Sequence, residues 1–169
     1  LAAGCWSGRI GGAGRSLPVK PVGGQMAALE HVPRLLRHVL QTSGCYMITR
    51  SDGRLLVGAT VEHRGFTARP TAAGVHVLLA SALLAVPGLA DAPVVELWAG
   101  LRPGTPDDLP ILGPDPIVGG LIHATGHFRN GILLAPITGE LIADAITGAR
   151  SALSMDAFAA ARFATGAGA

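Results

Sequence analysis

Two arginines each stand alone in a long stretch without other charged residues. Arg102 is the one charged side chain in positions 97–106, and Arg129 is the one in positions 116–139. A guanidinium stays protonated, so in an apolar setting it needs an anion or several hydrogen-bond acceptors. Each arginine lies in an expected glycine-flanked turn that follows an expected strand. The pair therefore indicates sites for a carboxylate or a phosphate.

Pairing inside the protein is the alternative for both arginines. Asp107 and Asp108 are close enough in sequence to bind Arg102, and backbone carbonyls could satisfy Arg129. Residue types alone leave both interpretations open, because a buried guanidinium is tolerated whenever its donors find acceptors.

Two polar side chains could assist these arginines. Tyr46 is the only tyrosine and opens an expected strand, where its hydroxyl could orient a bound acid. His127 shares a glycine-bounded loop with Arg129 and could hydrogen-bond a ligand. The alternatives are a half-buried strand tyrosine and a structural histidine.

The sequence contains none of the common catalytic or metal-binding motifs. Gly-x-Ser-x-Gly, a Walker loop and a paired-carboxylate motif are absent, and the six histidines have no metal-ligand spacing. Cys5 and Cys45 are too few for a disulfide framework. We therefore expect no metal site, no catalytic side chain, and two reduced, buried thiols in a cytoplasmic protein.

Composition bounds the class of protein. The 169 residues carry a net charge of +2, with 14% charged and 49% hydrophobic residues. Such a chain is too apolar to be disordered, and its charge is too small to argue for nucleic acid or an anionic membrane as a partner. No basic region precedes an apolar run at the start, so no signal peptide is expected.

One uncharged stretch, 70–90, is about as long as a bilayer span. Two prolines, Pro70 and Pro87, bracket its central part, and Thr71 is suited to be an N-cap. Apolar residues recur there at helical spacing on one face, namely Val75, Leu78, Leu79, Ala82, Leu83 and Val86. The pattern predicts a buried amphipathic helix over 71–86 rather than a membrane span.

Turn residues and hydrophobic spacing predict the remaining elements. In chain order they are the tail of a strand at 1–3, a glycine-rich connection or short helical turn at 5–16, strand character over 17–29 broken by Pro21 and Gly23-Gly24, a hairpin of 45–49 and 54–60, a strand at 94–98, a proline-rich loop over 103–116, a strand at 121–124, the loop 126–131, a helix closed by Gly148, and a last short helix capped by Ser154.

Two long motifs resemble one enzyme family. They are Trp-Ala-Gly-Leu-Arg-Pro-Gly-Thr-Pro-Asp-Asp-Leu-Pro-Ile-Leu-Gly at 98–113 and Gly-His-Phe-Arg-Asn-Gly-Ile-Leu-Leu-Ala-Pro at 126–136, supported by pieces at 1–7, 18–26 and 53–60. In these motifs the chain resembles the C-terminal half of the glycine oxidases. These are FAD-dependent amino-acid oxidases of the D-amino acid oxidase superfamily that serve bacterial thiamine biosynthesis. The resemblance covers nearly the whole chain.

The resemblance implies an α+β fold, in which an α/β flavin domain is interleaved with a substrate domain built on an antiparallel sheet. Residues 1–14 and 112–169 would belong to the FAD-binding domain, and residues 15–111 to the substrate-binding domain. The family's opening Gly-x-Gly-x-x-Gly unit, which holds the FAD pyrophosphate at a helix N-terminus, has no counterpart in the sequence. The chain is therefore expected to be a fragment of the FAD-dependent D-amino acid oxidase-like fold without its N-terminal dinucleotide-binding βαβ unit.

The resemblance also implies roles for single residues. Arg102 would clamp the substrate carboxylate, Arg129 would lie beside it, and Tyr46 would close the carboxylate end. A helix N-terminus would face the flavin, where it suits the negative charge of the reduced ring. The implied flavin contacts are His127, Phe128, Arg129, Asn130, Gly131, Ile132, Leu133, Ala3 and Gly4.

Three functions stay open on this basis. The first is a fragment of a glycine oxidase-like flavoenzyme, active when its N-terminal FAD-binding half is present. It would convert glycine or a small amine or D-amino acid to the oxo acid, ammonia and hydrogen peroxide. The second is a non-catalytic remnant that needs a complementing half, and the third is an oxidase or dehydrogenase for another small D-amino acid. Expected partners are a small amino acid, dioxygen and the missing N-terminal half, but no nucleic acid and no membrane, and assembly with a second copy of the chain is left open.

The isolated chain is predicted to bind FAD poorly, because the dinucleotide loop and its helix dipole are absent from the 169 residues. We expect a colourless purified protein and no quenching of flavin fluorescence at micromolar FAD. A purified chain that carries stoichiometric flavin would contradict this expectation.

Overall fold

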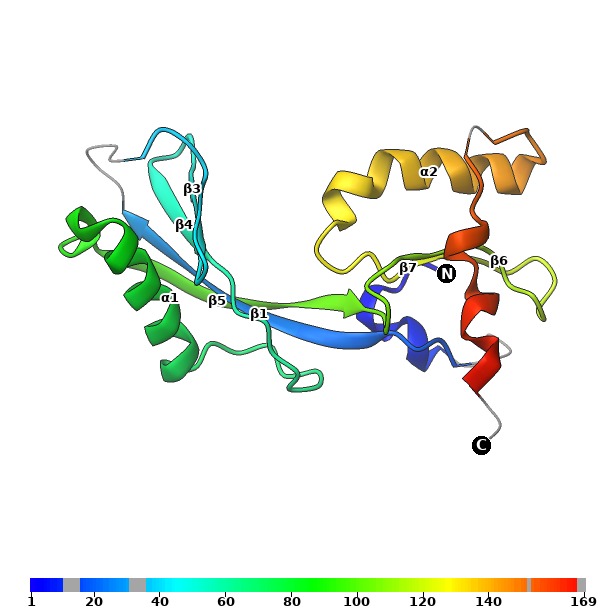
Figure 1. Ribbon diagram of the computed structural model, residues 1–169, viewed down its shortest axis with the longest axis horizontal. Helices are drawn as coiled ribbons and strands as arrows, with labels where there is room; N and C mark the ends of the chain where they lie inside the picture. The colour runs from blue at the N-terminus through cyan, green and yellow to red at the C-terminus, as the bar shows by residue number, and fades with distance from the viewer. Residues whose placement is uncertain (11–15, 31–35, 152, 167–169) are drawn as a thin grey trace. The chain divides into compact units, whose positions relative to one another are not determined.

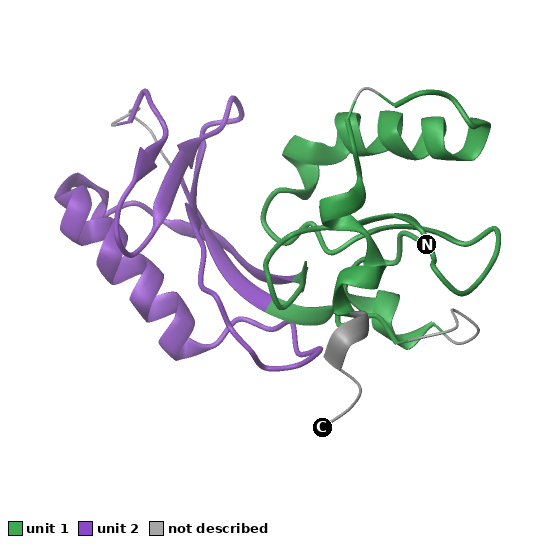
Figure 2. Cartoon of the chain, turned by 45° about the vertical axis from the view of Figure 1, so that its right-hand side comes forward, with its two compact units in different colours: residues 1–22, 102–169 green, residues 23–101 purple. Residues whose placement is uncertain are grey.

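The computed structural model describes residues 1–10, 16–30, 36–151 and 153–166. The chain forms two compact units, residues 1–22 with 102–169 and residues 23–101 (Figure 2). The second unit is shorter than the substrate domain of 15–111 that the resemblance implies. Which unit serves the flavin and which the substrate stays a prediction.

Figure 1 labels the main helices and strands. In chain order the elements are the 3₁₀ segment η1 (Gly4–Arg9), strands β1 (Lys20–Glu30), β2 (Leu40–Gln41), β3 (Tyr46–Thr49) and β4 (Arg54–Gly58), helix α1 (Ala72–Ala85), the 3₁₀ segment η2 (Pro87–Leu89), strands β5 (Val94–Gly104), β6 (Ile111–Pro114) and β7 (Ile122–Thr125), helix α2 (Gly131–Thr147), and the 3₁₀ segments η3 (Asp156–Phe158) and η4 (Ala160–Gly166).

The larger sheet has the strand order β2-β3-β4-β1-β5. The predicted hairpin is confirmed, since β3 and β4 pair antiparallel and a carboxylate oxygen of Asp52 accepts a hydrogen bond from the Arg54 N–H at 3.1 Å. In register, Gly58 of β4 lies between Tyr46 of β3 and Met26 of β1. Residues directly opposite on antiparallel strands point to the same face, so these three share one face of the sheet.

The expected break in β1 at Gly23-Gly24 does not occur. Gly23 stays extended because Glu62 pairs with it, through hydrogen bonds of 2.8 and 2.9 Å between their backbone groups. Pro21 also lies within β1, in the part that precedes the ladder with β4, which begins at Met26.

The predicted helix over 71–86 is confirmed as α1. The Thr71 hydroxyl accepts a hydrogen bond from the Gly74 N–H at 3.2 Å, and Pro87 follows the last turn. Leu78 and Ala82 are fully buried, whereas Leu83 of the expected apolar stripe is 37% exposed. Within the described chain, no helix is long and apolar enough to cross a membrane.

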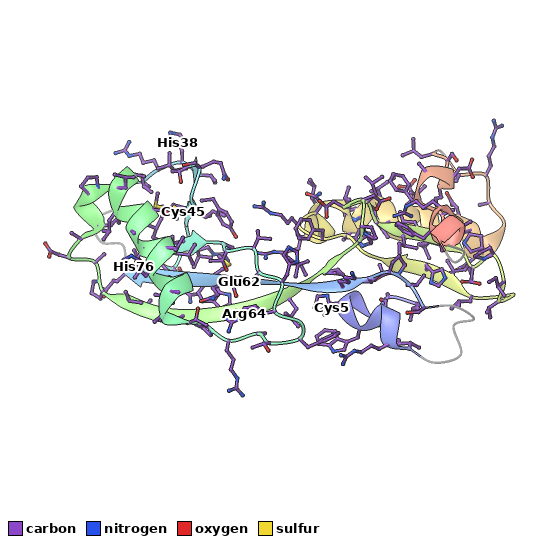
Figure 3. The ribbon with its side chains drawn as sticks, turned by 60° about the horizontal axis from the view of Figure 1, so that its bottom comes forward. Cys5, His38, Cys45, Glu62, Arg64 and His76 are labelled. Carbon is purple, nitrogen blue, oxygen red and sulfur yellow. The ribbon has the colours of Figure 1, made fainter. Side chains whose placement is uncertain are left out.

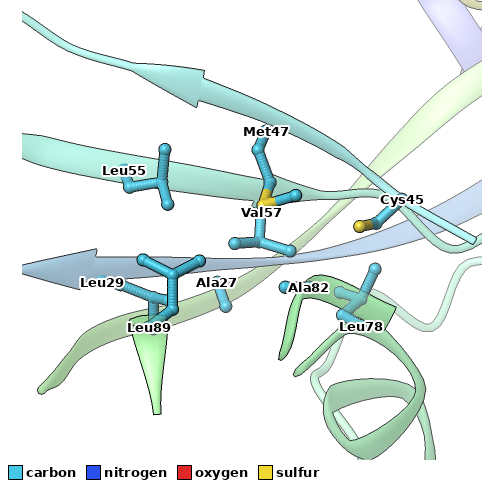
Figure 4. Close-up of a cluster of buried hydrophobic side chains, with 9 residues drawn as sticks. All are labelled: Ala27, Leu29, Cys45, Met47, Leu55, Val57, Leu78, Ala82 and Leu89. Atoms are coloured by element: carbon cyan, nitrogen blue, oxygen red, sulfur yellow. The ribbon is translucent and has the colours of Figure 1, made fainter. Parts of the chain in front are cut away.

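The other sheet face packs on α1 and forms the core of unit 23–101 (Figure 4). Burial of such apolar side chains is the main force that holds a sheet and a helix together. The core residues are Ala27, Leu29, Cys45, Met47, Leu55, Val57, Leu78, Ala82 and Leu89.

A buried polar network ties α1 to β1 and to the segment after β4. The Gln25 side chain is 1% exposed. Its amide nitrogen donates to Glu62 at 2.5 Å and to the Thr71 hydroxyl at 3.1 Å, and its oxygen accepts from the Thr71 N–H at 2.8 Å. The Thr60 hydroxyl donates to Glu62 at 2.7 Å. Arg64 lies 3.8 Å from the second Glu62 oxygen (Figure 3), so this carboxylate keeps a cationic neighbour.

The unit of 1–22 and 102–169 contains the antiparallel pair β6–β7 and helix α2. Here the expected proline-rich loop over 103–116 is partly wrong, because β5 continues to Gly104 and β6 starts at Ile111. Residues 1–3, expected as the tail of a strand, are not part of a strand, although Leu1 forms hydrogen bonds with the Ile122 carbonyl and the Ala124 N–H of β7.

Two predictions for the chain from α2 onward have different outcomes. Gly148 closes α2 in the left-handed conformation, as predicted. The last short helix is instead two 3₁₀ segments, η3 and η4, although the Ser154 hydroxyl does accept the Asp156 N–H at 3.1 Å.

A buried hydrogen bond joins β7 to the residue that follows β6. His123 Nε2 lies 2.8 Å from an oxygen of Asp115, and both side chains are fully buried. The other Asp115 oxygen accepts the N–H groups of Ile117 and Val118, each at 2.8 Å. The hydrogen bond from His123, with those from the backbone, lowers the pKa of Asp115 to about 2. The pair therefore fixes the β6–β7 turn with a carboxylate that stays ionised.

Replacement of Gly74 by alanine should destabilise unit 23–101. The new Cβ would lie 2.3 Å from the Gln25 amide nitrogen, so the buried amide must move and lose hydrogen bonds. We expect the free energy of unfolding to fall by about 1–3 kcal/mol in urea titrations followed by circular dichroism. Gly139→Ala in α2 is the matched control, since its Cβ meets nothing within 4 Å. It should be neutral or stabilising by about 0.5–1 kcal/mol, and equal losses in both variants would contradict the argument.

Acid should destabilise the unit that contains β6 and β7 over the pH range in which Asp115 takes up a proton. Because its pKa is lower in the folded chain than in the unfolded one, the stabilisation is present above about pH 4 and is lost as the pH falls toward about 2. Urea midpoints of the wild type should therefore drop over this window. Asp115→Asn should start lower and lose that part of the pH dependence. A variant curve parallel to the wild type would show that Asp115 is not responsible.

Candidate functional site

The loop 126–131 joins β7 to α2 and has a constrained backbone. Gly126 and Phe128 have φ values of 78° and 47°, in the left-handed region. A Cβ on Gly126 would lie 2.7 Å from a methyl carbon of Thr105, so only glycine lets the loop approach the end of β5 this closely. The Phe128 N–H donates to the Pro103 carbonyl at 3.0 Å. The loop therefore lies against the residue that follows Arg102.

Helix α2 begins directly after this loop with an open N-terminus. Its N-cap residue, Asn130, makes no side-chain capping bond, so the first N–H groups of the helix are left for another acceptor. Ile132 and Leu133 in this first turn are 95% and 77% exposed. Unpaired N–H groups beside large apolar side chains suit a flat ring with negative charge at one edge.

The beginning of the chain lies at the same end of β7. The Gly4 carbonyl accepts a hydrogen bond from the Thr125 hydroxyl at 3.2 Å, and that hydroxyl lies 2.7 Å from the buried Ser7 hydroxyl. Ala3 precedes Gly4 and accepts the Trp6 N–H. Ala3, Gly4 and the loop 126–131 thus come from distant parts of the sequence to one end of one strand.

His127 is tied to α2 by its side chain. Its Nε2 lies 3.0 Å from the Thr138 hydroxyl, and burial lowers the pKa of the imidazole. His127 is therefore neutral near pH 7, and its ring serves the structure of the loop. Sequence reasoning did not single out Thr138, although its place three residues before the buried Leu141 marks it as a residue of the inner helix face.

Asp107, one of the two acidic residues expected as alternative partners of Arg102, is bound by Arg162. Arg162 donates to both oxygens of Asp107, at 2.8 and 3.2 Å, and this contact lowers the pKa of Asp107 to about 2. Arg102 is half-buried at the end of β5. Arg129 is exposed, and none of the ion pairs between described residues includes it.

Tyr46 belongs to the other compact unit, so its nearness to the two arginines stays a prediction. It is half-buried in β3, and its hydroxyl donates to the Met26 sulfur at 3.7 Å. The structure thus brings the Arg102 turn, the loop 126–131 and residues 3–4 into one neighbourhood. The assignment of ligand contacts to any of them also stays a prediction.

Metal binding gains no support from the structure. Among the described residues no three His, Cys, Asp or Glu side chains form a group that could hold a metal ion. Cys5 and Cys45 are both free and buried, in different units (Figure 3). Burial raises the pKa of the Cys5 thiol, so this sulfur is protonated near pH 7.

Known proteins resemble the chain over nearly its full length. A glycine oxidase of Pseudomonas aeruginosa is 46% identical over 149 residues, which are 88% of this chain and 41% of that protein. Hydrogen cyanide synthase subunit HcnC of the same organism is 44% identical over 164 residues, 96% of this chain and 39% of that protein. The crystal structure of glycine oxidase from Geobacillus kaustophilus superposes with a TM-score of 0.90 at 41% identity and covers 95% of this chain and 44% of that one.

These relatives are longer than the chain, which spans about 40% of the length of the two curated proteins named above. The structure, with its antiparallel sheets and helices, matches part of the glycine oxidase fold, as the resemblance implied. The model of the family described as FAD dependent oxidoreductase matches residues 1–145. The chain therefore belongs to the FAD-dependent oxidoreductase family, whose cofactor is FAD.

Proposed function

We propose that this chain is the substrate-binding and flavin-facing part of an amino-acid oxidase that acts on glycine or another small amino acid. The hydrogen bond from Phe128 to Pro103 carries the proposal, because it joins the Arg102 turn to the loop before α2. A carboxylate-binding side chain and an anion-favouring helix start are thereby linked through one backbone contact within one compact unit.

The residues at the start of α2 fit a flavin ring. The first N–H groups of α2 favour negative charge, and the exposed Ile132 offers apolar surface to a flat aromatic system. The close packing of Gly126 on Thr105 keeps the loop backbone in place. FAD, when bound, supplies an acceptor for the hydride that leaves the substrate carbon.

The side chains of this segment bind and orient the substrate in the proposal. Arg102 holds the carboxylate through charge-assisted hydrogen bonds, Arg129 adds positive charge beside it, and the Tyr46 hydroxyl closes the carboxylate end. Neutral His127 holds the loop through Thr138, and the proposal requires no general base from the protein. Amino acid, dioxygen and water would give the oxo acid, ammonia and hydrogen peroxide.

A second candidate activity has equal support from similarity. HcnC, a hydrogen cyanide synthase subunit, is as similar to the chain as the glycine oxidase is. Oxidation or dehydrogenation of another small D-amino acid, or a remnant without activity, are further possibilities that the same site would permit. A role in thiamine biosynthesis, a cytoplasmic location and a homo-oligomer belong to the glycine oxidase proposal and depend on it.

The proposal predicts that Arg102→Leu damages substrate binding far more than folding. The test protein is a chimera in which residues 1–169 replace the matching segment of the Geobacillus kaustophilus glycine oxidase. Peroxide release from glycine should show a KM roughly 30- to 5,000-fold higher, the equivalent of about 2–5 kcal/mol for one lost partner of a buried charge pair. Assays with other D-amino acids and for cyanide release separate the alternative activities.

Arg150→Leu is the control, since Arg150 is an exposed arginine of the same unit. It should leave the kinetics and the circular dichroism spectrum unchanged. If Arg102→Leu keeps the parental KM while the chimera is active, Arg102 does not hold the substrate and the proposed site is wrong.

A further inference from the structure

Gly58 lies between two side chains that meet above it. Its register partners are Tyr46 on β3 and Met26 on β1, so the three residues form one row across the sheet. A Cβ on Gly58 would lie 2.8 Å from the Tyr46 hydroxyl oxygen, 2.9 Å from the ring carbon that carries it, and 2.8 Å from the methyl carbon of Met26. The far end of the phenol therefore lies over Gly58, and the side chain crosses β4 toward β1.

This row is on the sheet face opposite the core. The next residues along the same strands, Ala27, Met47 and Val57, are fully buried against α1. Side chains alternate between the faces of a sheet, so Met26 and Tyr46 point away from that core. Both are half-buried. The position of Tyr46 is therefore set by contacts on this face rather than by packing in the core.

The Tyr46 hydroxyl donates its proton to a weak acceptor. The Met26 sulfur lies 3.7 Å from the hydroxyl oxygen. A thioether accepts hydrogen bonds only weakly, while sulfur and an aromatic ring attract one another modestly. A carboxylate oxygen would accept the same proton in a stronger, charge-assisted bond. The contact with Met26 thus holds the phenol without competing seriously for its proton.

We propose that Gly58 and Met26 are positioning residues for the Tyr46 hydroxyl. The missing side chain of Gly58 lets the phenol lie across β4, and the Met26 thioether holds it there with its proton available to a carboxylate. The inference rests on the proposed role of Tyr46 in substrate binding. It adds two uncharged residues that set the geometry of carboxylate recognition.

The first experiment reads Tyr46 directly in the 169-residue chain, without flavin or activity. Tyr46 is the only tyrosine, so ¹³C labelling of tyrosine gives ring signals from one residue. Gly58→Ala should shift these signals, and Met26→Leu, which keeps the volume but removes sulfur, should shift the carbon that bears the hydroxyl. Gly100→Ala is the control, since Gly100 lies on β5 of the same sheet with nothing within 4 Å of its added Cβ. Signals that respond to Gly58→Ala no more than to Gly100→Ala would overturn the inference.

The second experiment measures glycine oxidation in the chimera. Gly58→Ala should raise the KM about tenfold and Met26→Leu about threefold, as expected for one misplaced hydrogen bond, with kcat little changed. Tyr46→Phe is measured beside them. If Tyr46→Phe raises the KM but the other two variants do not, the positioning role is wrong and the proposed function stands. If Tyr46→Phe leaves the KM unchanged while Arg102→Leu raises it, Tyr46 has no part in substrate binding. The inference is then wrong, because it rests on that role. If Gly58→Ala does not fold, Met26→Leu decides alone.

Discussion

The hydrogen bond between the Phe128 N–H and the Pro103 carbonyl holds together the two segments on which the candidate site depends. β5 ends at Gly104 and β7 ends at Thr125, so two strands of distant sequence deliver their last residues to one place. Close approach of the loop requires a bare Cα at Gly126, because a side chain would strike Thr105. Phe128 accepts a left-handed backbone that a phenylalanine seldom adopts. Such strain persists only where neighbouring contacts over-determine the conformation, which is typical of ligand sites.

Two acidic side chains of the same unit, Asp107 and Asp115, have hydrogen-bond donors close at hand. Both oxygens of Asp107 are bound by Arg162, and both oxygens of Asp115 are bound by His123 and the following backbone. Each of these carboxyl groups has a pKa near 2 and is therefore an anion at any physiological pH. Because these anions have their own donors, they compete little with an external carboxylate for Arg102 or Arg129.

The sequence was a good guide where local chemistry decides structure. Thr71 and Pro87 bound α1, Asp52 and Gly53 make the hairpin turn, and Gly148 ends α2, each through contacts within a few residues. It failed where a distant partner decides. Gly23 remains in a strand because Glu62 pairs with it. Residues 111–114 form a strand because β7 pairs with them. The candidate arginines were found from their isolation among apolar residues. The packing of Tyr46 over Gly58 was not predicted. It depends on the pairing of β3 with β4, and the residue types glycine and methionine do not indicate which side chain will lie beside them.

Side chains on the two faces of β1 have different contacts. The register of this strand therefore links the stability of the fold to the proposed recognition of substrate. Gln25 points toward α1 and fixes the start of that helix through Thr71, while the adjacent Met26 points to the other face and contacts Tyr46. Beyond the end of β4 at Gly58, the Thr60 hydroxyl joins the Gln25 network, since it accepts the Gln25 N–H and donates to Glu62. A shift of β1 along β4 by one residue would exchange these faces, burying Met26 and exposing the Gln25 amide. The polar network opposes such a shift, because a slipped Gln25 would leave Glu62 and Thr71 without their partner. The register that keeps the helix capped is thus the register that keeps the Tyr46 hydroxyl over Gly58.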